Sequence, residues 1–456
     1  MRSLMLGVVL VVLALPLGAA DAPATPSGFV GHYQAAMRAR ESKDYVAMET
    51  ALREALKLRP VHPAATYQLA AALALQDKPR PAVDELRRLA RMGLTFDAAG
   101  DADFAALRGR TGFDDVAADF RRNALPRGEA RVGFTVPAPS FIPEGLAYDD
   151  DENEFFLGSV RQRRIERVRE DGSREALKPA KPLWAVMGLA VDKDDEKLWA
   201  ATSALPEMEK AEASELGRAA IVVFDLESGA EDKRYELPSD GRKHVIGDLL
   251  PPRDGKVYAT DSAAGELLEL DLASGRFTAL GPAGAMASPQ GLAWARGGRS
   301  LFVADYTQGL YRYDLRRREL KRLEVSRDIC VYGIDGLYRY GDELVAVQNG
   351  VRPHRVIQLE LERDRRVRGA RVLASALRQF DEPALGVIDG DRFHFIANSQ
   401  WGKFGKDHAL PPEAELKGPV ILRIDLGRRE GEQPSRGPGA APAPTQGPLP
   451  LPVPRL

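Results

Sequence analysis

The sequence has little cysteine, little net charge and few long apolar runs. Cys330 is the only cysteine among 456 residues, so neither a disulfide framework nor a zinc site built from thiolates is available. The formal net charge is −2, which gives no electrostatic case for nucleic acid as the main partner. A hydrophobic share of 44% beside 29% charged residues is typical of a folded, soluble chain. Any metal or redox chemistry must therefore use groups other than sulfur.

The two ends of the chain differ in composition from the rest. An apolar run at residues 4–17 follows Arg2 and precedes small residues at 18–20, which is the pattern of a cleavable export signal. The run is too short to cross a bilayer comfortably. We expect residues 1–22 to be a signal peptide and the mature protein, with no membrane span, to be periplasmic or secreted in a bacterium; an uncleaved anchor is the alternative. Residues 428–456 are rich in Pro and Gly and predict a disordered tail.

Residues 29–122 predict an α-helical module. Tyr-Gln-Ala-Ala at 33–36 recurs as Tyr-Gln-Leu-Ala at 67–70, an offset of 34 residues, and an amphipathic segment at 51–60 ends at a proline. The offset, the small residues and the terminal proline resemble the tetratricopeptide repeat. Such a module is expected either to bind a protein partner or to form a cap packed on the next domain.

From residue 129 to residue 426 the apolar pattern becomes strand-like, and one unit recurs six times. Each unit has a Gly-Leu-apolar opening, a short turn and a hydrophobic strand, with openings at positions 145, 188, 248, 291, 336 and 386. Four-stranded units repeated in this way predict a mainly β fold, a six-bladed β-propeller behind the TPR-like helical module. The segment 129–136 has no blade of its own, and we expect it to pair with 420–426 and close the ring.

Meander geometry gathers polar residues at one mouth of the central channel. The residue before each opening and the end of each second strand lie on the same face, because successive strands are antiparallel. This face carries Glu144, Gln290, Asp335, Asp305, Asn349 and Asn398. Converging oxygen donors favour a hard cation. The alternative is that they only cap strand ends in a water-filled channel.

Three of the openings resemble a known group of propellers. Pro-Glu-Gly at 143–145, Gln-Gly at 290–291 and Asp-Gly at 335–336 resemble the SMP-30/gluconolactonase/LRE-like superfamily of calcium-binding propellers, whose relatives include paraoxonase and strictosidine synthase. The resemblance spans roughly residues 140–400.

The resemblance implies a ligand set for a divalent cation. It assigns the ligands to Glu144, Gln290 and Asp335, and the ion to Ca²⁺ first, with Mg²⁺, Mn²⁺ or Zn²⁺ as alternatives. The sequence departs from the family pattern twice. Gln290 stands where the family carries Asn, and Gly247 stands where relatives commonly carry Asn.

The resemblance also implies a reaction. A bound cation would polarise the carbonyl of a lactone or ester, and a base would activate water. Asp335, Asp248 and His244 are the candidate bases, although a histidine here is more often structural. A metal-dependent hydrolase with a small-molecule substrate is therefore favoured. The alternative is a non-catalytic propeller scaffold that binds a small ligand or a protein partner.

Substrate contacts are expected from polar and aromatic residues on the same face. They are Asp248, Asp305, Asn349, Asn398 and Trp401. Trp401 is expected either to stack on a ring of the substrate or to pack over a blade. The charged insertion at 204–219 has helical character and is interpreted as a lid or as an ordinary surface helix.

Overall fold

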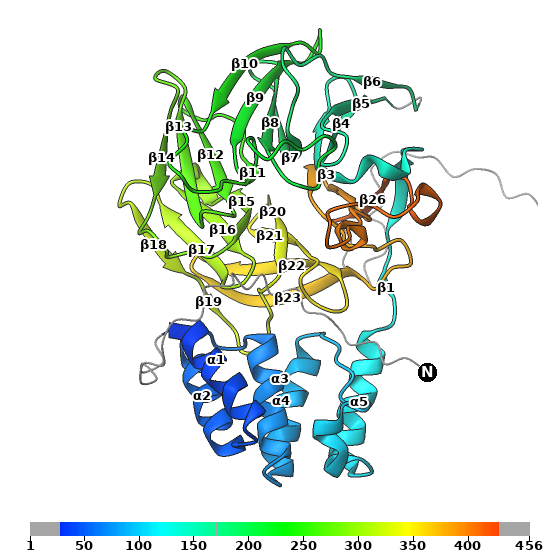
Figure 1. The fold of residues 1–456 in the computed structure, drawn as a ribbon. Coiled ribbons are helices and arrows are strands. Elements are labelled where there is room, and N and C mark those ends of the chain that lie inside the picture. Colours follow the sequence, from blue (N-terminus) through cyan, green and yellow to red (C-terminus); the bar gives the residue numbers. More distant parts are fainter. Residues whose placement is uncertain (1–27, 170–171, 428–456) are drawn as a thin grey trace, which may run out of the picture. The chain divides into compact units, whose positions relative to one another are not determined.

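The computed structural model describes residues 28–169 and 172–427. The predicted signal peptide and the predicted tail lie outside these ranges. The chain forms two compact units, one that ends at Ala124 and takes in Arg327–Cys330, and one that begins at Leu125. Figure 1 shows helices in the first unit and strands in the second. No helix within the described ranges is long and apolar enough to cross a membrane.

From residue 28 onwards, the first unit contains five α-helices and a short 3₁₀ helix, η1 (Ala102–Leu107). The α-helices are α1 (Gly28–Glu41), α2 (Tyr45–Leu58), α3 (Pro63–Ala74), α4 (Pro79–Arg91) and α5 (Thr111–Asn123). Proline begins α3 and α4, where the missing amide proton costs nothing. The two copies of the 34-residue offset fall in α1 and α3, which pack on α2 and α4 respectively. The helical prediction is confirmed, and the tetratricopeptide assignment stays a prediction.

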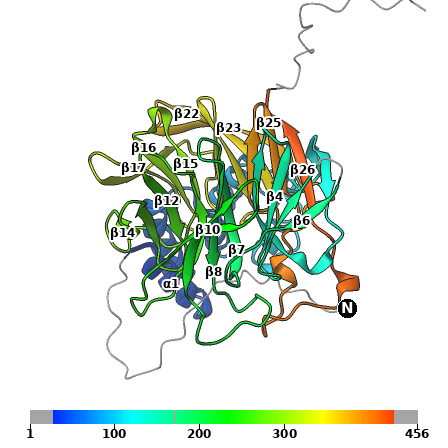
Figure 2. The same ribbon diagram turned by 90° about the horizontal axis from the view of Figure 1, so that it is seen from above.

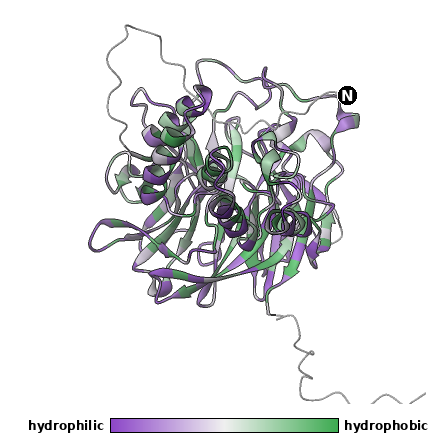
Figure 3. Cartoon of the chain, turned by 90° about the horizontal axis from the view of Figure 1, so that it is seen from below, coloured by the Kyte–Doolittle hydropathy of each residue, from purple (hydrophilic) through white to green (hydrophobic). Residues whose placement is uncertain are grey.

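The helices of this unit are amphipathic, as their periodicity requires. Figure 3 shows hydrophobic and hydrophilic residues on the same helices. Met48 and Leu52 of α2 are fully buried, as are Leu86 and Leu89 of α4. Apolar positions three or four residues apart lie on one side of a helix, so these side chains form the buried face of each helix.

The second unit begins with three four-stranded sheets. The first contains β3 (Pro143–Asp149), β4 (Glu154–Ser159), β5 (Ile165–Val168) and β6 (Arg174–Ala176). The second contains β7 (Ala185–Asp192), β8 (Lys197–Ser203), β9 (Ala219–Asp225) and β10 (Glu231–Glu236). The third contains β11 (Ile246–Leu249), β12 (Lys256–Asp261), β13 (Glu266–Asp271) and β14 (Arg276–Leu280). Each sheet is an antiparallel meander in chain order.

Three further sheets complete the set. The fourth contains β15 (Pro289–Trp294), β16 (Ser300–Asp305), β17 (Gly309–Asp314) and β18 (Glu319–Arg322). The fifth contains β20 (Ile334–Tyr340), β21 (Glu343–Gln348), β22 (Arg355–Glu362) and β23 (Arg366–Ser375), with β1 (Arg127–Gly128) and β19 (Glu324–Val325) paired to β23. The sixth contains β24 (Gly386–Asp389), β25 (Arg392–Ile396), β26 (Val420–Asp425) and β2 (Arg131–Thr135).

The six sheets form a closed ring. The first strands touch in the order β3, β7, β11, β15, β20 and β24, and β24 touches β3 again. Figure 2 shows the sheets from above. β2 pairs antiparallel with β26, so the sixth blade takes its outer strand from the start of the unit and the predicted closure is confirmed. The chain is a six-bladed β-propeller, as predicted.

The glycine that recurs at the blade openings is required because neighbouring first strands approach closely at the channel. A Cβ on Gly188 would lie 2.8 Å from the Cα of Asp248, and one on Gly291 would lie 2.6 Å from the carbonyl oxygen of Asp335. Neighbouring first strands therefore approach too closely for any side chain at these positions. In five blades the pairing of the first two strands also shifts register at the opening, which marks a β-bulge.

The insertion after β8 is a loop of turns, so the prediction of helical character is wrong. Its carbonyl groups at Glu207 and Glu209 accept hydrogen bonds from Arg161 and Arg163 of the first blade. A helix would satisfy these carbonyls through its own amides. Here arginine side chains do so, and the backbone stays irregular between Ser203 and Ala219.

Candidate metal and catalytic site

Three carboxyl groups at the channel are almost completely buried. Glu144 is 6% exposed, Asp248 is 8% exposed and Asp335 is 9% exposed. All three lie in or beside the bulges where the first strands begin. A bulge redirects a side chain that a regular strand would place against its neighbour. The bulges at the strand openings therefore direct these carboxyl groups towards the channel.

Glu144 is held by one side-chain donor. The indole Nε1 of Trp401 donates a hydrogen bond to its Oε2 at 2.7 Å. Burial raises the pKa of the Glu144 carboxyl well above its usual range, and the negative charge of Asp335 raises it further. Two carboxyl groups that interact in this way at a buried site favour either a shared proton or a bound cation.

Asp335, like Glu144, has one carboxylate oxygen held by a side-chain donor. The amide Nδ2 of Asn349 donates to its Oδ2 at 2.8 Å, and the Oδ1 of Asn349 accepts from the hydroxyl of Tyr306 at 2.9 Å. Burial raises the pKa of Asp335 to about 7, although the hydrogen bond from Asn349 opposes the shift, and the charge of Glu382 adds to it. Asn349 thus orients the carboxylate.

Asp248 joins the third and fourth blades. Its Oδ1 accepts from the amide of Leu249 at 2.9 Å, and its Oδ2 accepts from the amide of Leu292 at 3.1 Å. Burial raises its pKa to about 7, against the effect of these two amides. The two amides therefore hold the side chain in one orientation, and its pKa is near neutrality.

Gln290 and Gly247, the two departures from the family pattern, lie together. The Oε1 of Gln290 lies 3.2 Å from where a Cβ on Gly247 would stand, and its Nε2 donates to the Oγ of Ser288 at 3.1 Å. The longer side chain at 290 extends towards the space that glycine leaves open at 247. The two departures are therefore sterically compatible.

The donor chemistry of these residues suits a hard divalent cation. Glu144, Asp335 and Gln290 supply only oxygen ligands, which Ca²⁺ and Mg²⁺ prefer. Ligands in metal sites are usually held by hydrogen bonds from outer residues. Trp401 and Asn349 hold one oxygen each of Glu144 and Asp335 in this way.

Asp305 and Asn398 have their polar atoms engaged by loops. The carboxylate of Asp305 accepts from the amides of Ala287, Ser288, Thr307 and Gln308. Asn398 donates to the carbonyl of Gly418 and accepts from the amide of Val420. These contacts give no support to the predicted role of either residue in substrate binding. They correspond to the alternative of strand-end capping.

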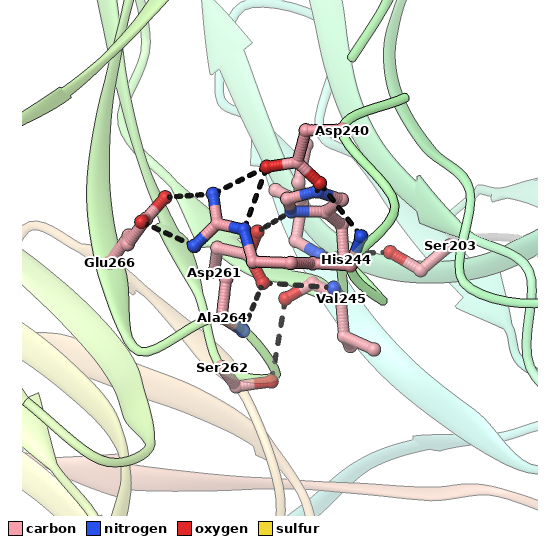
Figure 4. A network of polar contacts seen from close by, with 10 residues as sticks. Ser203, Asp240, His244, Val245, Asp261, Ser262, Ala264 and Glu266 are labelled. Carbon is pink, nitrogen blue, oxygen red and sulfur yellow. Dashed lines mark hydrogen bonds and ion pairs between the residues drawn. The ribbon is translucent and has the colours of Figure 1, made fainter. Parts of the chain in front are cut away.

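His244 lies between two carboxylates, as Figure 4 shows. Its Nδ1 is 2.5 Å from the Oδ2 of Asp261, and its Nε2 is 3.0 Å from the Oδ1 of Asp240. Burial lowers the pKa of His244, but hydrogen bonds to Asp261 and Asp240 raise it above the usual value overall. Both ring nitrogens are engaged, so the contacts favour the structural interpretation over a catalytic base.

Two residues near the candidate site were not predicted. The charge of Glu382 raises the pKa of both Glu144 and Asp335. Tyr306 reaches the site through Asn349. Tyr306 directly follows Asp305, the last residue of β16, so its position just past the end of a second strand was an available signal. Glu382 lies in the loop before β24 and follows no opening motif.

Comparison with known proteins gives structural neighbours but no family. No protein-family model matches the chain, and no curated protein matches it. Similar solved structures include a gluconolactonase from Xanthomonas campestris, with 16% identity and a TM-score of 0.45, covering 66% of this chain and 92% of that one. The calcium-binding protein regucalcin from Agrobacterium tumefaciens has 15% identity and a TM-score of 0.47, covering 65% and 95%.

A luciferin-regenerating enzyme is similar at 14% identity and a TM-score of 0.47, covering 66% of this chain and 96% of that one. The kinds of protein that the sequence resembles are thus among its structural neighbours. The six-bladed β-propeller itself follows from this chain's own strand pairing. None of these similarities assigns a site residue, a cofactor or a substrate to this chain.

Proposed function

We propose that this chain is an exported, divalent-cation-dependent hydrolase that acts on a lactone or an ester at the channel mouth. The observation that carries the proposal is the pair Glu144 and Asp335. Both are almost completely buried, the charge of Asp335 raises the pKa of Glu144, and each has one oxygen fixed by a side-chain donor. Neutralising one carboxyl group of such a pair removes a cation ligand and also removes the charge repulsion with the other group.

Glu144, Asp335 and Gln290 would hold the cation. When bound, a divalent cation polarises a carbonyl group and stabilises the oxyanion that forms on hydrolysis. Asp248 is the strongest candidate for the base, because the amides of Leu249 and Leu292 fix its orientation and its pKa is about 7. A base with a pKa near the working pH accepts a proton from water most effectively.

A second candidate function is a non-catalytic binding scaffold. Gly247 and Gln290 differ from the pattern of the hydrolases that the sequence resembles, and this favours a mouth that binds a small ligand without turnover. The helical unit would then bind a protein partner. This candidate predicts ligand binding without hydrolysis.

One experiment separates the two functions. Metal content of the purified protein is measured by mass spectrometry, and hydrolysis of a panel of lactones and esters is followed with and without chelator. Glu144→Gln and Asp335→Asn are compared with the control Asp342→Asn, whose side chain is 71% exposed. We expect loss of metal and turnover in the first two variants alone. Turnover that survives chelator and both substitutions would refute the hydrolase proposed here.

A further inference from the structure

The loop between β25 and β26 reaches Glu144 of the candidate metal site through the side chain of Trp401. Trp401 lies near its start and donates its indole proton to Glu144, which is 257 residues away in sequence. Further along the loop, the Nδ1 of His408 lies 2.7 Å from the Oε1 of Glu207, in the loop that follows β8. Loop 399–418 thus contacts both the candidate site and a second loop.

The residues on either side of Trp401 are fixed by other contacts. Gln400 donates to the carbonyl of Lys417 and accepts from the amide of Lys417, which closes the base of the loop. The amide of Gly402 donates to the Oε2 of Glu382. Gln400 and Glu382 both have positive φ, at 60° and 59°, a conformation that surrounding contacts must stabilise. The position of the indole is therefore determined by the fold.

The hydrogen bond from Trp401 limits how Glu144 can act. The terminal torsion of a glutamate is broad, so an unrestrained carboxylate samples many orientations. An indole N–H is a donor only, so it fixes the Oε2 as an acceptor and leaves the Oε1 for another ligand. Outer donors of this kind typically change metal affinity by 10–100-fold.

We infer that Trp401 is a positioning residue for Glu144, and that it couples the conformation of loop 399–418 to occupancy of the cation site. The inference rests on the proposed function in taking Glu144 as a ligand. The coupling is reciprocal: if this loop conformation strengthens cation binding, bound cation stabilises the same conformation by the same factor. Trp401 thereby has a role different from stacking on substrate.

The first test measures affinity for Ca²⁺ by calorimetry after treatment with chelator. Trp401→Phe keeps an aromatic ring and removes the donor, and we expect Ca²⁺ to bind about 10–100-fold more weakly. The matched control is Trp294→Phe, because Trp294 in the fourth blade packs edge-on against Tyr258 in the third, and we expect wild-type affinity. Equal affinity in wild type and Trp401→Phe would overturn the positioning role while leaving the metal site in place.

The second test measures amide hydrogen exchange in loop 399–418 without added metal. We expect Trp401→Phe to exchange faster than wild type in this loop, and Ca²⁺ to slow exchange in wild type more than in the variant. If wild type binds no Ca²⁺, the proposed function and the positioning role both fail. If wild type binds Ca²⁺ but exchange in the loop is the same in both proteins, the coupling alone is overturned.

Discussion

Replacing Asp335 with Asn should stabilise the metal-free protein at pH 8. The pKa of Asp335 in the folded chain is about 7, against an ordinary value of 3.8, because the group is buried close to other carboxyl groups. Raising the pKa of Asp335 from 3.8 to about 7 corresponds to about 4 kcal/mol of unfavourable ionisation above pH 7. Asparagine keeps an acceptor for the Nδ2 of Asn349 and carries no charge.

The sign of the pH dependence follows from proton linkage. The folded chain holds a proton on Asp335 between about pH 4 and pH 7, where the unfolded chain has lost it. Stability of the metal-free wild type therefore falls as the pH rises through this window. Asp335→Asn lacks this loss, so we expect little difference at pH 4 and about 2–4 kcal/mol in favour of the variant at pH 8.

Thermal unfolding in chelator at a series of pH values measures the effect. For a domain of this size, about 2–4 kcal/mol corresponds to a rise in Tm of roughly 4–8 °C. With saturating Ca²⁺ the order should reverse, because the variant has lost a ligand. The exposed control Asp342→Asn should change stability by no more than about 0.5 kcal/mol. An Asp335→Asn protein that is less stable than wild type at pH 8 in chelator would refute the reasoning.

Three further predictions test residues away from the metal ligands. His244→Gln should lower the free energy of unfolding by about 3–5 kcal/mol, because the buried Oδ2 of Asp261 loses its contact with the imidazole. Turnover per folded molecule should be unchanged, and a loss of kcat at full folding would restore His244 as a base. Asp305→Asn should lower the free energy of unfolding by about 1–3 kcal/mol, because the new side-chain amide would face backbone amides that need an acceptor. KM should be unchanged, and a raised KM in folded protein would support substrate contact instead. Deleting residues 131–135 should expose an edge of β26 and cause aggregation in light scattering, and a soluble monomer would contradict the closure.

The sequence predicts the ring because one steric constraint recurs in it. Where first strands meet at the channel, Gly145, Gly188 and Gly291 have no room for a side chain, and the constraint leaves a visible repeat. The closing strand was predictable because 131–135 had no blade of its own. Both features follow from local sequence and from the cost of an unpaired sheet edge.

The roles of individual polar residues could not be predicted in the same way. The positions of Asp305 and Asp335 relative to their strands predict that both lie at the channel mouth. Backbone amides, however, occupy the carboxylate oxygens of Asp305, while Asp335 faces the site. Which oxygen meets which donor depends on loop conformation, and the repeat carries no information about it. Glu382 was missed for this reason, since its contribution depends on a loop with positive φ.

The most direct test of the central claim is a calorimetric titration of chelator-treated protein with Ca²⁺. The account predicts one site per chain in wild type, with binding lost or at least about 100-fold weaker in both Glu144→Gln and Asp335→Asn. Asp342→Asn should bind as wild type does. Wild-type affinity in both site variants, or no heat of binding in wild type, would contradict the claim that these two carboxylates hold a divalent cation.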